Sequence, residues 1–470
     1  MSEQQPATGD TDAMSRRQIA FMVGALLLAV VSFQLNASML APAIRDIETE
    51  LGAGSYAAMS TYFYLAGAVA NVVLIRWSDF VGRKRMILGA LVVVCIGTLL
   101  CVVSTSLTVV LIGRVLQGVS NINFGLAFLI MRERLSAKTF GVCSGIVTAM
   151  TGGVAGADGL LGGWMADNFG YQSIFMLIGV VGLIGIVVCA VAVPSDDAQR
   201  GASGRMDWAG AALIALGVAG LNLFFAAGSN TGWVSPLALG LIVAAMVALV
   251  ALVLVERRIA HPLVDVDQMR SRQAWPLVVV IVLNMASFMV VLGFVVPYIA
   301  EDQDSGFGFS GLTTALFFLT PAALIQLATA PLFGRLAVRI GFVTLLRGGL
   351  AGSVVVVVLL TQCTHSFVLV AVLVAVMGVV YMAMVMTAMS ALAVLQAPEA
   401  EPGSLPGISN AAYGVGSSIG FAWAGPIVGS GTASTFPIAL WTCVGIGVVS
   451  LGVSMVLRPR TPSRAPSSSG

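Results

Sequence analysis

Charge is the property that this chain has least of. Only 9% of its 470 residues are charged and its net charge is +2, whereas soluble domains carry about 25% charged residues. Such a balance offers no basic surface for nucleic acid, and we expect no nucleic-acid partner. The two histidines are isolated and the six cysteines show no metal-ligand spacing, so we expect neither a metal nor another cofactor.

Catalytic patterns are missing as well. The sequence shows no paired acids inside its apolar runs, no phosphate-binding loop and no nucleophile next to a base. Those are the groupings on which enzyme chemistry depends. An enzyme, including one embedded in a membrane, is therefore not expected.

Long apolar runs dominate what is present. Hydrophobic residues make up 58% of the chain, and a membrane-spanning helix needs roughly 20 apolar residues. The sequence predicts an all-α integral membrane protein with fourteen transmembrane helices. They lie at about residues 19–43, 56–77, 86–104, 107–131, 139–163, 172–193, 208–227, 235–255, 275–299, 311–333, 343–361, 366–393, 407–428 and 436–457.

The orientation follows from the basic loops. An even number of spans places both termini on one side, and short loops rich in Lys and Arg mark the cytoplasmic side. Loops such as 83–85 and 132–138 then share the side of the termini, while Glu301, Asp302 and Asp304 lie opposite. We expect a multi-pass monomer in the cytoplasmic membrane, with both termini in the cytoplasm.

A weak internal repeat indicates two related halves. The segment SDFVGRK (78–84) and the segment GRLAVRIG (334–341) each follow a predicted span at an offset of about 259 residues. Paired six-helix bundles around a midplane site are typical of transporters. The predicted division is a disordered tail (1–15), an N-terminal six-helix bundle (16–193), a linker with two inserted helices (194–274), a C-terminal six-helix bundle (275–457) and a second disordered tail (458–470).

Three motifs carry a family resemblance. The loop at 75–84 matches the pattern G-x-L-A-D-R-x-G-R-K at Asp79, Gly82, Arg83 and Lys84, without the leading Gly and the Arg after the Asp. The segment 114–118 reads Arg-Val-Leu-Gln-Gly, and 158–163 reads Asp-Gly-Leu-Leu-Gly-Gly where the family has G-P-x-x-G-G. The chain resembles major facilitator superfamily transporters of the fourteen-helix drug:proton antiporter type.

The resemblance implies a function. It implies proton-coupled efflux of lipophilic or cationic drug-like compounds by alternating access, with a small-molecule substrate and protons as partners. It also implies that the loop with Asp79, Gly82, Arg83 and Lys84 is a gate; a basic loop that only sets topology is the alternative. Because Asp158 and Gly159 replace the family's Gly-Pro, a dedicated exporter or facilitator of one metabolite, with no or different ion coupling, remains the second hypothesis.

Asp158 is the acid that lies clearly inside a predicted span. It continues a polar stripe formed by Ser144, Thr148 and Thr151, and a polar stripe on a membrane helix should face water or protein. Burial and nearby cations act in opposite directions on such a carboxyl. We expect Asp158 to carry the coupled proton, with Arg114 tuning its affinity; a static ion pair between the two is the rival hypothesis. For Arg114 itself, the alternative is a structural arginine bonded to backbone carbonyls.

The predicted substrate cavity rests on polar and aromatic residues within the spans. Most of these are amides or hydroxyls, which few membrane helices tolerate facing lipid. The residues are Gln34, Asn36, Gln117, Asn121, Asn284, Phe288, Tyr381, Asn410 and Tyr413.

Overall fold

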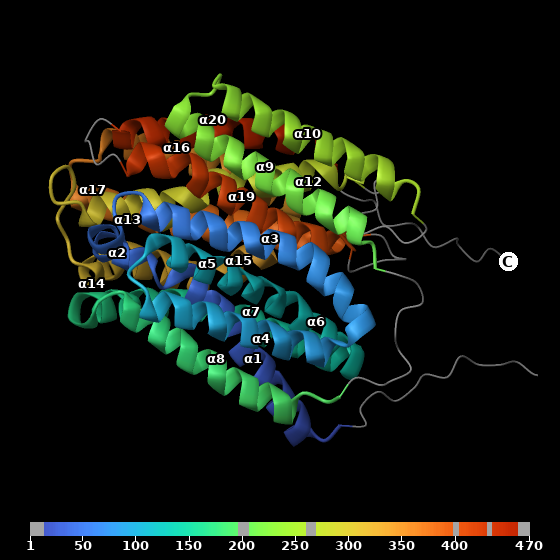
Figure 1. The fold of residues 1–470 in the computed structure, drawn as a ribbon. Coiled ribbons are helices and arrows are strands. Elements are labelled where there is room, and N and C mark those ends of the chain that lie inside the picture. The colour runs from blue at the N-terminus through green and yellow to red at the C-terminus, as the bar shows by residue number, and fades with distance from the viewer. Residues whose placement is uncertain (1–13, 196–205, 260–268, 398–403, 430–434, 459–470) are drawn as a thin grey trace, which may run out of the picture.

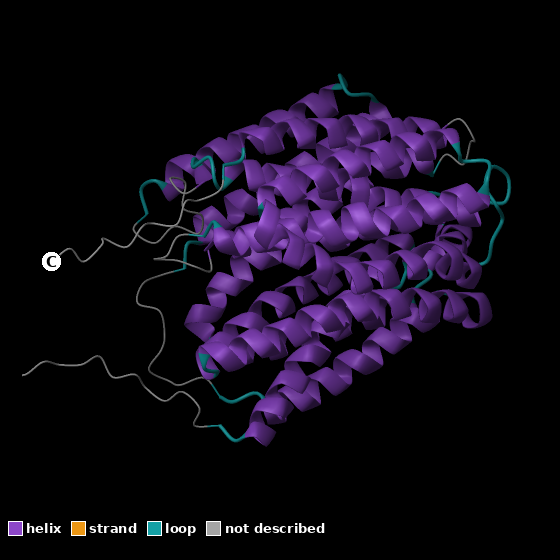
Figure 2. Cartoon of the chain, turned by 180° about the vertical axis from the view of Figure 1, so that it is seen from behind, coloured by secondary structure: helices purple, strands orange, loops and turns teal. Residues whose placement is uncertain are grey.

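The computed structural model describes residues 14–195, 206–259, 269–397, 404–429 and 435–458. Regular structure in these ranges is helical throughout (Figure 2). The predicted disordered tails, 1–15 and 458–470, lie outside the described residues apart from 14, 15 and 458.

The N-terminal half is a bundle of long helices with short connections. Its first helix begins with a capping box, in which the Ser15 hydroxyl accepts from the Gln18 backbone and the Gln18 side chain accepts from Ser15 N. The elements are α1 (Arg16–Ser38), η1 (Ala41–Ala43), α2 (Ile44–Leu51), α3 (Ser55–Val81), α4 (Arg83–Val103), α5 (Leu107–Gly118), η2 (Val119–Asn121), α6 (Ile122–Arg134), α7 (Ala137–Phe169) and α8 (Gln172–Ala192).

The C-terminal half repeats this pattern after two inserted helices, α9 (Trp208–Thr231) and α10 (Pro236–Glu256). Several of its helices contain wider π-helical turns. The elements are α12 (Trp275–Asn284), η3 (Met285–Met289), η4 (Val291–Val295), α13 (Val296–Glu301), α14 (Gly311–Thr314), η5 (Ala315–Leu319), α15 (Thr320–Ile340), α16 (Phe342–Gln362), α17 (Phe367–Met377), η6 (Gly378–Val385), α18 (Met386–Leu395), α19 (Ser404–Val428) and α20 (Thr435–Val456).

Prolines account for two of the wide turns. Pro297 follows η4 and Pro321 follows η5. A proline has no N–H to donate, and its ring clashes with the carbonyl four residues earlier, so the preceding turn must open.

Twelve helical segments in the described part are long and apolar enough to cross a membrane. They match twelve of the fourteen predicted spans. The other two predicted spans, 139–163 and 407–428, correspond to α7 and α19, which run alongside the rest (Figure 1). Membrane crossing by those two helices stays a prediction.

The inserted helices cover the seam between the halves. Helix α9 packs against both α3 of the N-terminal half and α19 of the C-terminal half, and α10 packs on α9 (Figure 1). Small residues allow the close approach, since a Cβ added at Gly220 of α9 would lie 2.9 Å from the Ala245 Cβ of α10.

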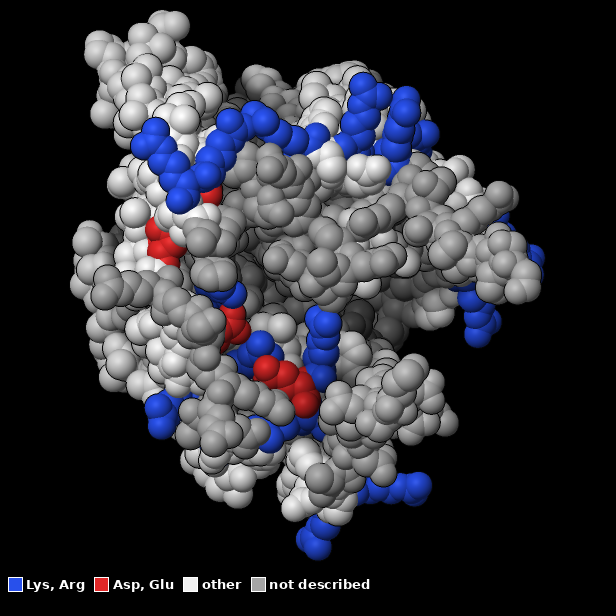
Figure 3. All heavy atoms as spheres, turned by 90° about the vertical axis from the view of Figure 1, so that its right-hand side faces the viewer, with Lys and Arg blue, Asp and Glu red and all other residues white. Residues whose placement is uncertain are grey.

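The two ends of the bundle differ in composition. We call the end where α1 begins and α20 finishes the terminal end, and the opposite end the far end. Lys and Arg side chains surround the terminal end, as Figure 3 shows. Gly82 joins α3 to α4 there with φ +101°, and Gly341 joins α15 to α16 with φ +89°. The same left-handed turn 259 residues apart agrees with the predicted repeat.

The halves meet in the far part of the molecule. A Cβ added at Gly163 of α7 would lie 2.5 Å from the Gly311 carbonyl of α14, and one added at Gly425 of α19 would lie 2.6 Å from the Ala57 Cβ of α3. Glycine at these positions lets the backbones of opposite halves touch. The far end is therefore closed.

The terminal end is open by comparison. Among the described residues, no atom of another element lies within 4 Å of a Cβ placed at Gly141 or Gly145 of α7 or at Gly407 of α19. Figure 3 shows that this face is hollowed near its centre. The structure is thus a conformation in which the space between the halves opens toward the chain ends.

Candidate functional site

Asp158 lies where the last turn of α1 meets the middle of α7. Its side chain is 3% exposed. The Ser38 hydroxyl donates to Asp158 Oδ2, while Oδ1 has no hydrogen-bond partner in the described part of the chain. Gln34 Nε2 in turn donates to Ser38 Oγ over 2.9 Å. Gln34, one of the predicted cavity residues, is therefore bonded to the same serine that bonds to Asp158.

Asp158 also lies beside the seam between the halves. The next residue, Gly159, faces Ala315 and Leu319 of the C-terminal half at 3.8 Å from the position of its Cβ. The Thr320 hydroxyl of α15 donates to the Gly156 carbonyl over 3.0 Å. A movement of α15 against α7 would therefore change what surrounds the carboxyl. The side chains of Thr148 and Thr151, which were predicted to share its stripe, lie outside the described part.

Arg114 is buried in the same half but bonds elsewhere. Its Nη1 donates to Gln117 Oε1 over 2.8 Å, its Nη2 to the Asn36 carbonyl over 3.2 Å and its Nε to the Met59 carbonyl over 3.4 Å. The guanidinium also lies 4.3 Å from the centre of the Phe63 ring, a cation–π distance.

The static ion pair with Asp158 is therefore not formed. Ion pairs among the described residues join Arg76 and Arg83 to Asp79, and Arg83 to Glu133. Arg114 connects to Asp158 only through α1, because the Asn36 carbonyl that it holds is two residues from Ser38. Tuning of Asp158 by Arg114 stays a prediction.

Three predicted cavity residues of the N-terminal half, Gln117, Asn121 and Asn36, bond within that half. Gln117 Nε2 donates to Thr98 Oγ1 of α4 over 2.9 Å, and Asn121 Oδ1 accepts from Asn71 Nδ2 of α3 over 3.3 Å. Asn36 is 1% exposed and its Nδ2 donates to the Ser32 carbonyl one turn earlier. These contacts give all three a packing role, and a part in binding substrate stays a prediction.

In the C-terminal half Phe288 contacts both α20 and another predicted residue, Tyr381. Asn284 Nδ2 donates to Ser450 Oγ of α20 over 3.0 Å, and Phe288 packs against α20 at Gly447 and against the Tyr381 ring of η6, with ring centres 5.7 Å apart. Tyr381 in turn lies within electrostatic reach of Tyr413 in α19 and of Tyr64 in α3. Asn410 is half-buried one turn before Tyr413.

An aromatic cluster that includes Tyr64 joins the two halves. The Tyr64 ring stacks on Phe421 of α19 with centres 5.8 Å apart, and the Tyr56 ring lies 5.6 Å from Phe294 of η4. The Tyr56 hydroxyl also donates to the Gly293 carbonyl over 3.0 Å. None of these residues was among the predicted cavity residues, although Tyr62-Phe63-Tyr64 is a conspicuous aromatic run.

Polar contacts complete the closed far end. The backbone N–H of Arg45 in α2 donates to Glu301 Oε2 of α13 over 3.0 Å. Asp167 of α7 accepts from the backbone N–H groups of Gly311 and Leu312, each over 2.9 Å. Every one of these bonds joins opposite halves, so all must break before the far end can open.

The loop predicted to be a gate forms an ion-pair network at the terminal end. Asp79 accepts from Arg76 over 3.1 Å and from Arg83 over 3.3 Å, and Arg83 reaches Glu133 at the end of α6 over 2.8 Å. Lys84 is half-buried beside them. Glu133 was not predicted because it stands alone between two arginines in the sequence. The network ties α3 and α4 to α6.

Within the described ranges, no group of His, Cys, Asp and Glu side chains is placed to hold a metal ion. The described side chains at the seam include Tyr64, Tyr381 and the buried Asp158 carboxyl.

Comparison with known proteins agrees with the geometry. The family model described as Major Facilitator Superfamily matches residues 26–420 and 277–470. The chain is 30% identical over 415 residues to a uridine/deoxyuridine transporter of Lactococcus lactis subsp. cremoris. The match covers 86% of this chain and 85% of the transporter. It is 25% identical over 431 residues to the multidrug resistance protein Stp of Mycobacterium tuberculosis, and the match covers 90% of this chain and 78% of Stp.

A solved structure shows the same architecture. The partially occluded, inward-open conformation of the xylose transporter XylE from E. coli superposes with a TM-score of 0.66 over 96% of this chain and 100% of that chain, at 12% identity. At that identity the likeness concerns the fold alone. With its two helical halves, its central site and these matches, the chain belongs to the major facilitator superfamily and is a multi-pass membrane transporter, not an enzyme.

Proposed function

We propose that the protein exports lipophilic or cationic drug-like compounds across the cytoplasmic membrane in exchange for protons. The observation that carries this proposal is the Asp158 carboxyl, which is buried at the seam between the halves. One of its oxygens is bonded to Ser38, and the other has no partner among the described residues. Buried ionisable groups in membrane spans are costly, and they commonly mark ion pathways.

The proposed cycle uses the two ends in turn. In the conformation described, the terminal end is open, so Asp158 exchanges protons with that side and substrate enters the space between the halves. Closure there and opening of the far end would separate Gly159 from Ala315 and expose the carboxyl to the other side. Substrate then leaves and Asp158 takes up a proton. The proton returns to the terminal side when the far end closes again.

This proposal assigns the terminal end to the cytoplasm. The Lys and Arg side chains around it support that assignment, because basic residues concentrate in cytoplasmic loops (Figure 3). It also treats α7 and α19 as membrane spans, giving fourteen, and the transporter as a monomer in which the loop with Asp79, Gly82, Arg83 and Lys84 acts as a gate.

The site between the halves supports substrates of low charge. Tyr64 of the N-terminal half and Tyr413 of the C-terminal half both lie within electrostatic reach of Tyr381, and each carries an aromatic ring and a hydroxyl group. Aromatic rings bind apolar and planar molecules broadly, and Asp158 supplies the buried carboxyl that a monocation would need. The likeness to a multidrug resistance protein is consistent with such a range.

A second candidate is a dedicated transporter of one metabolite, with different or no ion coupling. The specific observation in its favour is the uridine/deoxyuridine transporter, which is 30% identical and matches 85% of its own length. A nucleoside also presents a planar ring and hydroxyl groups, so tyrosines would suit it as well.

Efflux of a compound panel from cells that overproduce the protein tests the proposal. We expect several unrelated lipophilic cations to leave faster, and a protonophore to abolish the difference. Competition by uridine alone would favour the second candidate. Efflux that continues unchanged with the protonophore would contradict proton coupling.

Alternating access is tested by comparing two glycines of α7. A Cβ at Gly163 would meet the Gly311 backbone at 2.5 Å, whereas one at Gly156 would lie 3.4 Å from the Ala323 Cβ, close to ordinary contact. We expect Gly163→Ala to disfavour far-end closure and slow transport about tenfold, since one clash of 1–2 kcal/mol corresponds to that factor. Gly156→Ala should change little.

The measurement uses spin labels at Phe169 and His365, two exposed far-end positions in opposite halves. Cys95 and Cys363, the partly exposed cysteines, are replaced by serine beforehand. The label-to-label distance should lengthen in Gly163→Ala but not in Gly156→Ala. Equal distance distributions in both variants would contradict the closing role of Gly163.

A further inference from the structure

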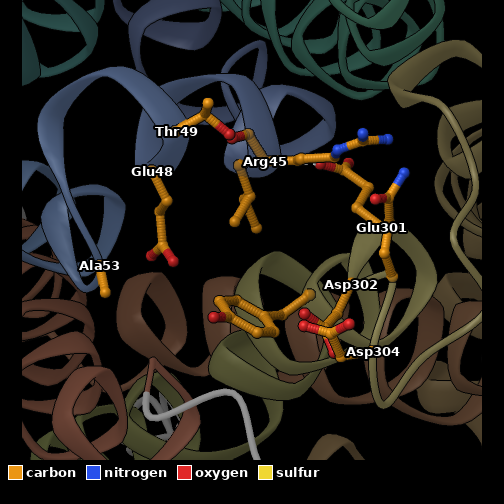
Figure 4. A pocket seen from close by; sticks show the side chains of 10 residues that line it. Arg45, Glu48, Thr49, Ala53, Glu301, Asp302 and Asp304 are labelled. Carbon is orange, nitrogen blue, oxygen red and sulfur yellow. Dashed lines mark hydrogen bonds between the residues drawn. The ribbon is translucent and has the colours of Figure 1, made fainter.

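A polar pocket of about 240 Å³ lies at the closed far end, between the two halves. Figure 4 shows Glu48 of the N-terminal half extending into it, with Asp302 and Asp304 of the C-terminal half on the other side. Asp158 is not among the residues that line this pocket. The pocket lies where α2 meets α13 and the loop that follows. Closure of the far end therefore creates it.

Closure brings like charges together there. The acids that line the pocket are Glu48, Glu301, Asp302 and Asp304, and Arg45 is the one cation in its lining. Three of these acids belong to one half and the fourth to the other. Like charges near a low-dielectric interior repel, so the fully ionised pocket opposes closure.

Two of the carboxyls bond across the seam. Glu301 is 2% exposed; its Oε2 accepts from the Arg45 N–H over 3.0 Å, and its Oε1 has no partner in the described part of the chain. The charged groups around Glu301 are Arg45 and two further acids, Asp46 and Asp167. A buried carboxyl with one empty oxygen, facing two like charges, is a site that a proton would satisfy.

Glu48 is the second carboxyl that bonds to the opposite half. Its Oε1 accepts from the Gly54 N–H over 3.2 Å, and the Tyr298 hydroxyl of the other half donates to it. Burial raises the pKa of the Glu48 carboxyl from its ordinary 4.5 to about 7, and the like charge of Asp302 adds to the rise, although both hydrogen bonds lower it. Opening would return water to this carboxyl.

We propose that this pocket is a second proton-binding site, separate from Asp158, in which protons bound to Glu48 and Glu301 hold the far end closed. Closure takes up protons and opening releases them to the far side. The proposal does not rest on the drug-efflux function, because it concerns only the equilibrium between closed and open far ends.

The sign of the pH dependence follows from linkage. For a group whose pKa is higher in the closed state, closure is favoured most strongly below the open-state pKa and progressively less as pH rises to the closed-state pKa. For Glu48 that window runs from 4.5 to about 7. Above it the closed fraction should level off.

The test measures far-end distances by pulsed electron spin resonance in the Phe169/His365 label pair, in lipid nanodiscs between pH 4.5 and 8. We expect the closed fraction to fall across this range in the otherwise unchanged protein. Glu48→Gln and Glu301→Gln each mimic the protonated form, so each should flatten the pH profile, and together they should keep the far end closed at pH 8.

A control variant separates this site from other acids at the far end. Glu50→Gln alters an exposed far-end acid that bonds to Gln172 within its own half, and it should leave the profile unchanged. A profile that persists in both Glu48→Gln and Glu301→Gln, or one that disappears in Glu50→Gln, would overturn the proposal. So would a closed fraction that does not change with pH.

Discussion

Arg114 and Asp158 are buried charged side chains of the same half, yet their surroundings differ. All three guanidinium nitrogens of Arg114 donate hydrogen bonds, and a ring covers its face. Asp158 has one bonded oxygen and one that has no partner in the described part of the chain. A charge whose bonds are all satisfied holds the fold together, whereas a carboxyl with an empty oxygen has room for a proton. On this difference we propose a structural role for Arg114 and a coupling role for Asp158.

The largest effect is expected from removing the proton site. Asp158→Asn keeps the shape of the side chain and an oxygen that can accept from Ser38, so the protein should fold normally. Substrate movement driven by a pH gradient in proteoliposomes should fall about 100-fold, as when an essential proton-transfer group is lost. Exchange of labelled for unlabelled substrate, which needs no net proton movement, should continue. Gradient-driven transport at the normal rate in Asp158→Asn would contradict a coupling role for Asp158.

Arg114→Lys should act on stability instead. Lysine keeps the charge but cannot make the forked set of bonds that the guanidinium makes. We expect a loss of about 1–3 kcal/mol from buried carbonyls left without a donor, seen as a lower melting temperature of the purified protein. Gradient-driven transport per folded molecule should persist.

The matched control is Arg76→Lys, whose side chain is 38% exposed in its pair with Asp79. Exposed pairs contribute little, so its melting temperature should hardly change. If Arg114→Lys abolished coupling while leaving the melting temperature intact, Arg114 would be a coupling residue and the assignment would be reversed.

A smaller effect should come from Ser38→Ala. The hydroxyl stabilises the charged form of the Asp158 carboxyl, so its loss favours the protonated form. The midpoint of the pH–transport profile should rise by about one pH unit, since a hydrogen bond to a charged group contributes about 1.5–3 kcal/mol. Ser32→Ala alters a buried serine of the same helix whose hydroxyl has no hydrogen-bond partner among the described residues. An equal shift in both variants would show that the Ser38 hydroxyl is not responsible.

Hydropathy and periodicity predicted much of the fold. Twelve of the predicted spans agree with apolar helical segments in the described part, because a lipid-facing surface demands long apolar runs. The repeated turns at Gly82 and Gly341 were also visible, since only glycine accepts that backbone conformation readily. Burial of Asp158 followed from its place inside a span.

The partners of the buried groups could not be predicted in the same way. Arg114 bonds to the Asn36 and Met59 carbonyls, and a backbone acceptor leaves no mark in a sequence. Gln117 and Asn284 face the interior of their own halves, which produces the same periodic pattern as facing a cavity. Helical period tells which residues share a face, but not which helix that face meets.

The most direct test of the central claim is to count protons. Purified transporter in weakly buffered detergent near neutral pH is mixed with a saturating compound that it transports, and a pH-indicator dye reports proton release. We predict release of protons from the unaltered protein and none from Asp158→Asn, with binding of the compound still measurable in both. The same release from both proteins would contradict the assignment of Asp158 as the carrier.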